Sequence, residues 1–120
     1  MPLFDQQAIE VMAMVLLFEQ AYQVTKDATY IELMFTSFMW FLGENELHIP
    51  LYDHETHGCC DGLQFNGINR NQGAESTLAY FIAHLTVLKA MENEYEYKKS
   101  VQAARAKELP LVKTYTINNN

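Results

Sequence analysis

The chain has few of the residues that build disulfide-linked or loop-rich proteins. Among its 120 residues are two cysteines, three prolines and five glycines. The two cysteines, Cys59 and Cys60, are adjacent, and a disulfide between sequence neighbours is strained and rare. We therefore expect reduced thiols, as is usual in the cytoplasm, and no secreted disulfide framework.

Basic residues and long apolar runs are also scarce. The chain carries 8 Lys and Arg against 15 Asp and Glu, for a net charge of -7. Such a surface repels phosphate, so we expect no nucleic-acid partner and no attraction to anionic membranes. The longest near-apolar run, residues 11–18, is far shorter than the roughly 20 residues of a membrane-spanning helix. Residues 1–5 contain no basic segment typical of a secretory signal. Together these absences predict a cytoplasmic protein without a membrane span.

Apolar residues, by contrast, are abundant: 49% of the chain is hydrophobic and 12% is aromatic. That suits one globular domain of this length. The pattern predicts a first helix over residues 6–26, with Asp5 as its N-cap, and a second over residues 29–42, ended by Gly43. Both are apolar around most of their circumference, so both should be buried on more than one side.

A third helix is expected to begin at residue 73 or 74 and to continue past Met91. Its charged extension, residues 92–109, should end before Pro110, because proline disrupts a helix interior. Residues 111–117 alternate weakly like a short strand, and the last three asparagines should fray.

Three helices with broad apolar faces cannot cover one another completely. Leftover apolar surface marks an interface. We therefore expect a homo-oligomer, or contact with a larger parent or partner chain. The expected organisation is a helical domain over residues 1–110 and a C-terminal tail over residues 111–120.

The connector over residues 52–77 is the best candidate for a functional site. It combines acidic, amide and other polar side chains with glycines. Connectors longer than about 12–15 residues are uncommon unless they are functional. Amides and carboxylates are suited to hydroxyl groups, so the composition predicts a carbohydrate pocket.

One long string carries a resemblance to a known family. It reads FMWFLGENELHIPLYDHETHGCCDGLQFNGINRNQGAESTLAYFIAHLTV, and its most specific pieces are residues 40–45, 50–53, 60–63 and 69–77. This string resembles the helical C-terminal region of some bacterial retaining glycosyltransferases, over about residues 5–89. In that family the region follows a two-lobed nucleotide-sugar transferase part and is similar to the (α/α) toroids of glycosidases and sugar epimerases. The resemblance implies an all-α fold, a fragment of an (α/α) toroid with two or three long helices and a long structured loop.

The chain departs from that family in one important respect. It has no Gly-rich strand-to-helix turn for a nucleotide diphosphate and no room for two α/β lobes. We therefore expect no transferase activity and no cofactor in this chain alone. The resemblance implies a helical accessory region that binds carbohydrate or holds a partner chain.

The resemblance also implies which residues contact carbohydrate, because the loops at one end of a toroid line its sugar pocket. These residues are Tyr52, Asp53, Asp61, Asn69, Arg70, Asn71, Gln72 and Glu75. Arg70 offers a fork for carboxylate, phosphate or vicinal hydroxyls, and Tyr52 offers a ring for stacking. The plainer alternative is helix capping by Asn71, with Glu75 in the first turn.

Two further hypotheses stay open for this segment. In a glycosidase-like hydrolase completed by another chain, Asp61 and Glu75 would be acid and base. Alternatively, Asp53 and Asp61 only brace the loop, and the chain is an oligomerising scaffold. Zinc-ligand types also occur close together, at His54, His57, Cys59, Cys60 and Asp61. Their spacing is not that of a known zinc finger or ribbon, so we expect no metal.

Overall fold

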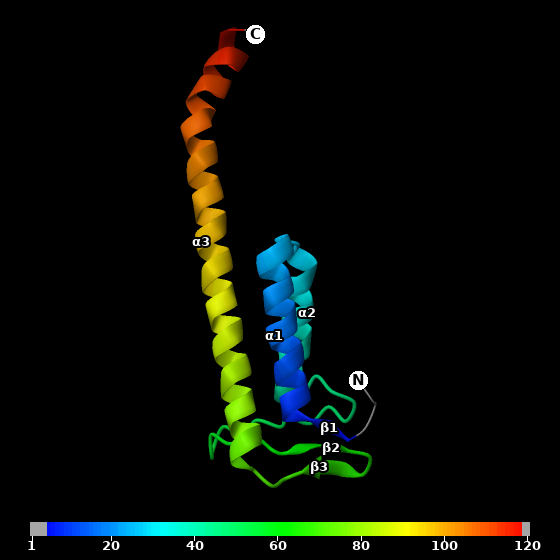
Figure 1. Ribbon diagram of the computed structural model, residues 1–120. Coiled ribbons are helices and arrows are strands. Elements are labelled where there is room, and N and C mark those ends of the chain that lie inside the picture. The colour runs from blue at the N-terminus through cyan, green and yellow to red at the C-terminus, as the bar shows by residue number, and fades with distance from the viewer. Residues whose placement is uncertain (1–4, 119–120) are drawn as a thin grey trace. The chain divides into compact units, whose positions relative to one another are not determined.

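The computed structural model describes residues 5–118, with side chains through residue 108. Three α-helices, one short 3-10 helix and a small three-stranded antiparallel sheet make up the fold (Figure 1). The chain forms two compact units, of which the first ends at Lys89 and the second begins at Ala90. The mostly helical architecture agrees with the sequence, whereas the sheet was not expected.

Helix α1 spans Ala8–Thr25. The expected N-cap, Asp5, is wrong, because Gln6–Gln7 form strand β1 and Gln7 is the residue before the helix. Strand β1 pairs antiparallel with strand β2, Gly62–Gln64. The backbone groups of β1 are therefore used in a ladder and not in a first helical turn. Lys26 ends α1 in the left-handed conformation, with φ 57°.

Helix α2 spans Ala28–Phe38 and continues directly into the 3-10 helix η1, Met39–Leu42. Asp27 caps α2, and its side chain accepts a 3.0 Å hydrogen bond from the backbone N–H of Thr29. Gly43 ends the segment at φ 113°, a conformation that favours glycine. The predicted second helix, with its stop at Gly43, is thus confirmed apart from its 3-10 final turn.

Strands β2 and β3 form a hairpin within the long connector. Strand β3 spans Gly67–Asn69, and the sheet order is β1-β2-β3. Gln64 pairs with Gly67, which leaves a two-residue turn over Phe65 and Asn66. Gly67 has φ 146°. Asn-Gly is typical of two-residue hairpin turns, but here the turn residues are Phe65 and Asn66, and Gly67 already pairs in the strand.

Helix α3 spans Ala74–Asn118. Its expected end before Pro110 and the expected strand over residues 111–117 are wrong, because the helix continues through both. A strand needs neighbours for its N–H and C=O groups, whereas a helix satisfies them within the segment. Of the asparagines expected to fray, Asn118 ends α3, and the other two lie outside the described residues.

The core of the first unit is aromatic. Phe41 has no exposed surface, and its ring centroid lies 5.2 Å from that of Trp40 and 5.3 Å from that of Tyr80. Phe38 adds a fourth ring, 5.9 Å from Phe41. The Trp40 indole N–H donates a 2.6 Å hydrogen bond to Oε1 of Gln6. This cluster therefore joins the second helical segment to β1 and α3, with Trp40 in the core.

The first part of α3 buries the face that carries its alanines. Ala79, Tyr80, Ala83 and Val87 are buried, whereas four larger apolar residues are exposed, namely Leu78, Phe81, Leu85 and Leu88. The expected surplus of apolar surface is therefore present on this helix. Within the described part of the chain, no helix combines the length and apolarity needed to cross a membrane.

Candidate functional site

All but one of the predicted site residues fall into two separate pockets, each of about 430 Å³. We call the first the sheet pocket, lined among others by Gln7, Asp61, Gln64, Asn69, Glu75 and Ser76. We call the second the loop pocket, lined among others by Tyr52, Asp53, Glu55, Cys60, Arg70 and Gln72. Asn71 lines neither of the two.

The division follows from the backbone between β3 and α3. Asn69 and Gly73 line the sheet pocket, whereas Arg70 and Gln72 line the loop pocket. Successive side chains of an extended segment point to opposite sides. Residues 69–73 therefore form a wall shared by the two pockets.

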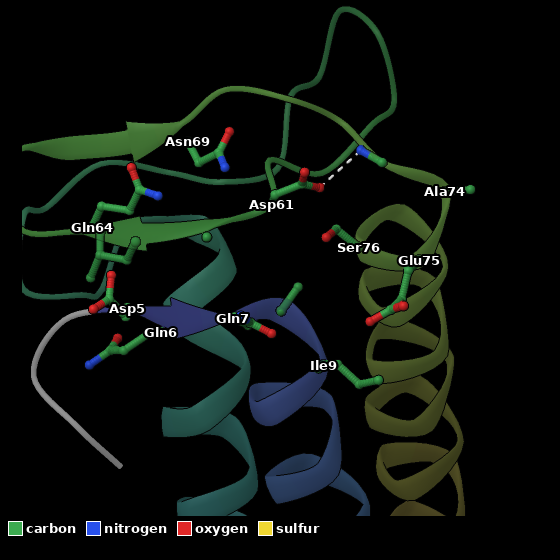
Figure 2. A pocket seen from close by; sticks show the side chains of 14 residues that line it. Asp5, Gln6, Gln7, Ile9, Asp61, Gln64, Asn69, Ala74, Glu75 and Ser76 are labelled. Carbon is green, nitrogen blue, oxygen red and sulfur yellow. Dashed lines mark hydrogen bonds between the residues drawn. The ribbon is translucent and has the colours of Figure 1, made fainter.

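Polar side chains from separate segments surround the sheet pocket (Figure 2). Gln7 comes from β1, Gln64 from β2, and Asn69 from the end of β3. Glu75 and Ser76 extend from the first turn of α3 on the opposite side. The pocket thus offers carboxylate, amide and hydroxyl groups together.

Asp61 is the most firmly held group of the sheet pocket. Its Oδ2 accepts a 2.7 Å hydrogen bond from Nδ2 of Asn71, and its Oδ1 accepts a 3.0 Å bond from the backbone N–H of Gly73. Figure 2 shows the second of these bonds. The bond from Asn71 most strongly, then that from Gly73, hold the pKa of the Asp61 carboxyl below its usual value of 3.8. Asp61 is therefore a carboxylate at neutral pH that ties the start of α3 to the connector.

These contacts predict an acid-sensitive connector. Because the pKa of Asp61 is lowered in the folded state, its stabilising contribution is present above pH 3.8 and is lost as the pH falls through the lowered value. We expect the urea midpoint of the chain to decrease as the pH falls below about 3.8. Asp61→Asn should lower the midpoint at pH 7 and make it less dependent on pH. Backbone hydrogen bonds also lower the pKa values of Asp27 and Asp53. An unchanged pH dependence in Asp61→Asn would contradict the assignment, since these two groups would then account for it.

The loop pocket has a similarly braced carboxylate. Oδ1 of Asp53 accepts a 2.8 Å hydrogen bond from the backbone N–H of Glu55, and its Oδ2 accepts a 3.3 Å bond from Nε2 of Gln72. The bond from Glu55 is the main reason that the pKa of Asp53 is lowered. Oε1 of Gln72 also accepts a 2.7 Å bond from the hydroxyl of Thr56. Asp53 and Gln72 therefore close the loop on itself, as the bracing alternative expected.

Tyr52 is less available for stacking than the sequence suggested. Its ring lies parallel to that of Tyr80, with centroids 4.1 Å apart and an angle of 13°. The ring of His54 meets it at 83° and 5.1 Å, and its hydroxyl lies 3.2 Å from Nδ1 of His57. One face of Tyr52 is thus used to fasten the connector to α3.

The adjacent cysteines are packing residues in this fold. Cys59 and Cys60 are both free and buried. Burial chiefly raises the pKa of Cys59 to about 12, and burial also raises the pKa of Cys60. Both are therefore thiols at neutral pH, a form that is a poor nucleophile and a poor metal ligand. Among the described residues, no three His, Cys, Asp or Glu side chains are placed to hold a metal ion.

Gln7, Gln64 and Ser76 are among the lining residues of the sheet pocket that were not expected from the sequence. Ser76 follows the predicted Glu75 in the first turn of α3, so its place beside a predicted residue was a signal in the sequence. The two glutamines belong to strands of two and three residues, which are too short to show a strand pattern.

Comparison with known proteins adds no family to these observations. No protein-family model matches the chain, and no curated protein matches it.

Proposed function

We propose that the chain is the helical accessory region of a bacterial glycosyltransferase-like protein and a fragment of an (α/α) toroid. In this proposal it binds carbohydrate in the sheet pocket and catalyses no reaction itself. The supporting observation is that carboxylate, amide and hydroxyl side chains from β1, β2, β3 and α3 line one open pocket. Such groups pair well with sugar hydroxyls, which both donate and accept hydrogen bonds.

The state of Asp61 suits binding. Its two oxygens are ionised at neutral pH and oriented by Asn71 and Gly73. A pre-oriented carboxylate accepts strong hydrogen bonds from hydroxyl groups without first losing rotamer freedom. Asn69 and Glu75, on the neighbouring walls, would supply further acceptors and, from the amide, donors.

Two adjacent residues give a matched test of the site. Asn69 lines the sheet pocket and Arg70 lines the loop pocket. In titrations with a panel of neutral and acidic oligosaccharides, followed by NMR chemical shifts, Asn69→Ala should weaken binding roughly tenfold, the loss of one or two net hydrogen bonds. Arg70→Ala should change it less than about twofold.

Two results would overturn this assignment. A larger effect of Arg70→Ala than of Asn69→Ala would move the site to the loop pocket. Shifts that are absent for every sugar of the panel would contradict carbohydrate binding by this chain. The scaffold alternative, in which the chain only associates with other chains, would then be favoured.

A glycosidase-like hydrolase with a pocket completed by another chain is the second candidate. It is favoured by one observation, that Asp61 and Glu75 line the same pocket. The lowered pKa of Asp61 is opposite to what a general acid needs. In a hydrolase, Glu75 would therefore be the acid, and Asp61 the base or nucleophile, the reverse of the order expected from the sequence.

Turnover separates the two candidates. A hydrolase predicts release of nitrophenol from aryl glycosides that is abolished by Asp61→Asn while sugar binding is kept. A binding region predicts no release by either protein. We also propose a cytoplasmic location, which the two free cysteines support.

A further inference from the structure

The exposed face of α3 carries a regular row of large apolar side chains. We call Leu78, Phe81, Leu85 and Leu88 the leucine stripe; they are 60%, 38%, 65% and 50% exposed. All four lie in the first unit, which ends at Lys89. Single exposed apolar residues are ordinary, but a contiguous row along one helix marks an interaction surface.

The leucine stripe is not the main face by which α3 packs on its own unit, although the ring of Phe81 also lies edge-on to that of Tyr52, with centroids 6.4 Å apart. The buried residues of this part of the helix are Ala79, Tyr80, Ala83 and Val87. At 100° per residue, these positions centre on the side of the helix opposite to the stripe. Helix α3 therefore has two apolar faces, and its own unit covers one of them.

The spacing of the stripe is that of a coiled-coil seam. Its members follow one another at intervals of three, four and three residues, as alternating a and d positions do. The row is also nearly symmetrical when reversed. A two-fold axis that crosses the stripe at the level of residue 83 places Leu78 against Leu88 of the partner subunit and Phe81 against Leu85 of the partner subunit. An antiparallel pair thus matches a to d positions along the whole stripe.

The charged residues beside the stripe favour the same antiparallel register. Glu75 and Lys89 are both exposed, and they lie two heptads apart, at equivalent e positions beside the stripe. In the antiparallel register, each Glu75 lies on the same side of the seam as Lys89 of the partner subunit, offset by two residues or about 3 Å along the axis, so the dimer has two such pairs. A parallel pair would keep the opposite charges about 21 Å apart, at 1.5 Å per residue. Charges at e positions set partner orientation in coiled coils.

We propose that the leucine stripe is the docking site for a second copy of this chain, in an antiparallel two-fold dimer centred at the level of residue 83. A self-complementary surface of this kind is what an isologous interface requires. Glu75 also lines the sheet pocket, so the partner subunit's Lys89 would lie at the edge of that pocket. The dimer does not depend on carbohydrate binding and is tested without any sugar.

The first test is the oligomeric state by sedimentation equilibrium, from about 5 µM to 500 µM chain. One helix face buries less area than the roughly 800 Å² per partner of a standard interface. We therefore expect a reversible dimer with a dissociation constant in the micromolar range. Leu85→Glu should give a monomer over the whole range. Leu17→Glu is the matched control, because Leu17 is 63% exposed on α1, and it should dimerise like the wild type. A monomeric wild type would overturn the proposal, and the stripe would then be a binding surface for a different protein. A dimer that survives Leu85→Glu would also overturn it.

The second test establishes the register. Glu75→Lys and Lys89→Glu each place like charges opposite each other twice, and each should weaken its own dimer roughly tenfold at low salt. Mixing the two variants restores opposite charges at both contacts, so a heterodimer as tight as the wild type is expected. Circular dichroism checks that both variants keep their helices. Homodimers of unchanged strength, or a mixture that does not recover, would overturn the antiparallel register.

Discussion

Phe41→Ala is expected to lower the free energy of unfolding by about 3–5 kcal/mol, the usual cost of truncating a fully buried phenylalanine. The Phe41 ring has no exposed surface and lies between Trp40 and Tyr80, so little around it can collapse into the space. Its carbonyl accepts hydrogen bonds from the N–H groups of Leu51 and Tyr52, at 2.9 and 3.0 Å. The substitution keeps this carbonyl, but a shift of the backbone into the space left by the ring would strain these bonds and loosen the connector as well as the core.

Urea unfolding followed by circular dichroism measures the effect. Leu17→Ala is the control, because Leu17 is a large apolar residue that is 63% exposed, and its truncation should cost less than about 1 kcal/mol. Phe41→Leu keeps most of the volume and should fall between the two. Equal midpoints for Phe41→Ala and Leu17→Ala would show that the aromatic cluster does not hold the first unit together.

The helices could be predicted because their signals are local. A period of 3.6 residues in apolar side chains marked all three, and Gly43 marked the end of the second segment. The errors occur where a segment distant in the sequence, or a second local rule, determines the secondary structure. Residues Gln6–Gln7 read as the start of a helix, but β2 recruits them into a sheet. Pro110 reads as a stop, but α3 continues past it.

The sequence predicted which region contains the site but not how its side chains are arranged in space. The segment over residues 69–75 does reach pockets, and its side chains do meet Asp53 and Asp61. Its division between two pockets depends on an extended backbone, which the sequence alone did not reveal. Bracing and binding could not be separated from residue types, because the same amides and carboxylates serve both. Only the hydrogen bonds show that Asn71 holds Asp61 and does not cap α3.

The exposed leucine stripe shows a similar limit. The sequence predicted a surplus of apolar surface, but periodicity does not say which apolar face of a helix turns inward. The structure buries the alanine face, because Tyr80 must reach Phe41 and Tyr52. The larger residues are then left for a partner.

Gly62→Ala is expected to destabilise the sheet by about 1–3 kcal/mol, the typical cost of an added methyl group in a space already filled. A Cβ at position 62 would lie 2.7 Å from the backbone oxygen of Gln6, so strand β1 would have to move away from β2. A backbone atom cannot yield as a flexible side chain does. The sheet pocket is lined from both strands, so this movement should also weaken carbohydrate binding, by an amount that exceeds the effect of Asn69→Ala.

The matched control is Gln64→Ala, an exposed position in the same strand, which should change the free energy of unfolding by less than about 0.5 kcal/mol. Hydrogen exchange at β1 and β2 gives the sharper measurement. Gly62→Ala should accelerate exchange of the amides that pair these strands and leave α2 unaffected, because the close contact is confined to the ladder. If exchange in β1 and β2 is unchanged, the close approach of Gln6 to Gly62 does not exist in solution. The sheet pocket would then lose the wall formed by β1, and a carbohydrate would have to bind against β2, β3 and α3 alone.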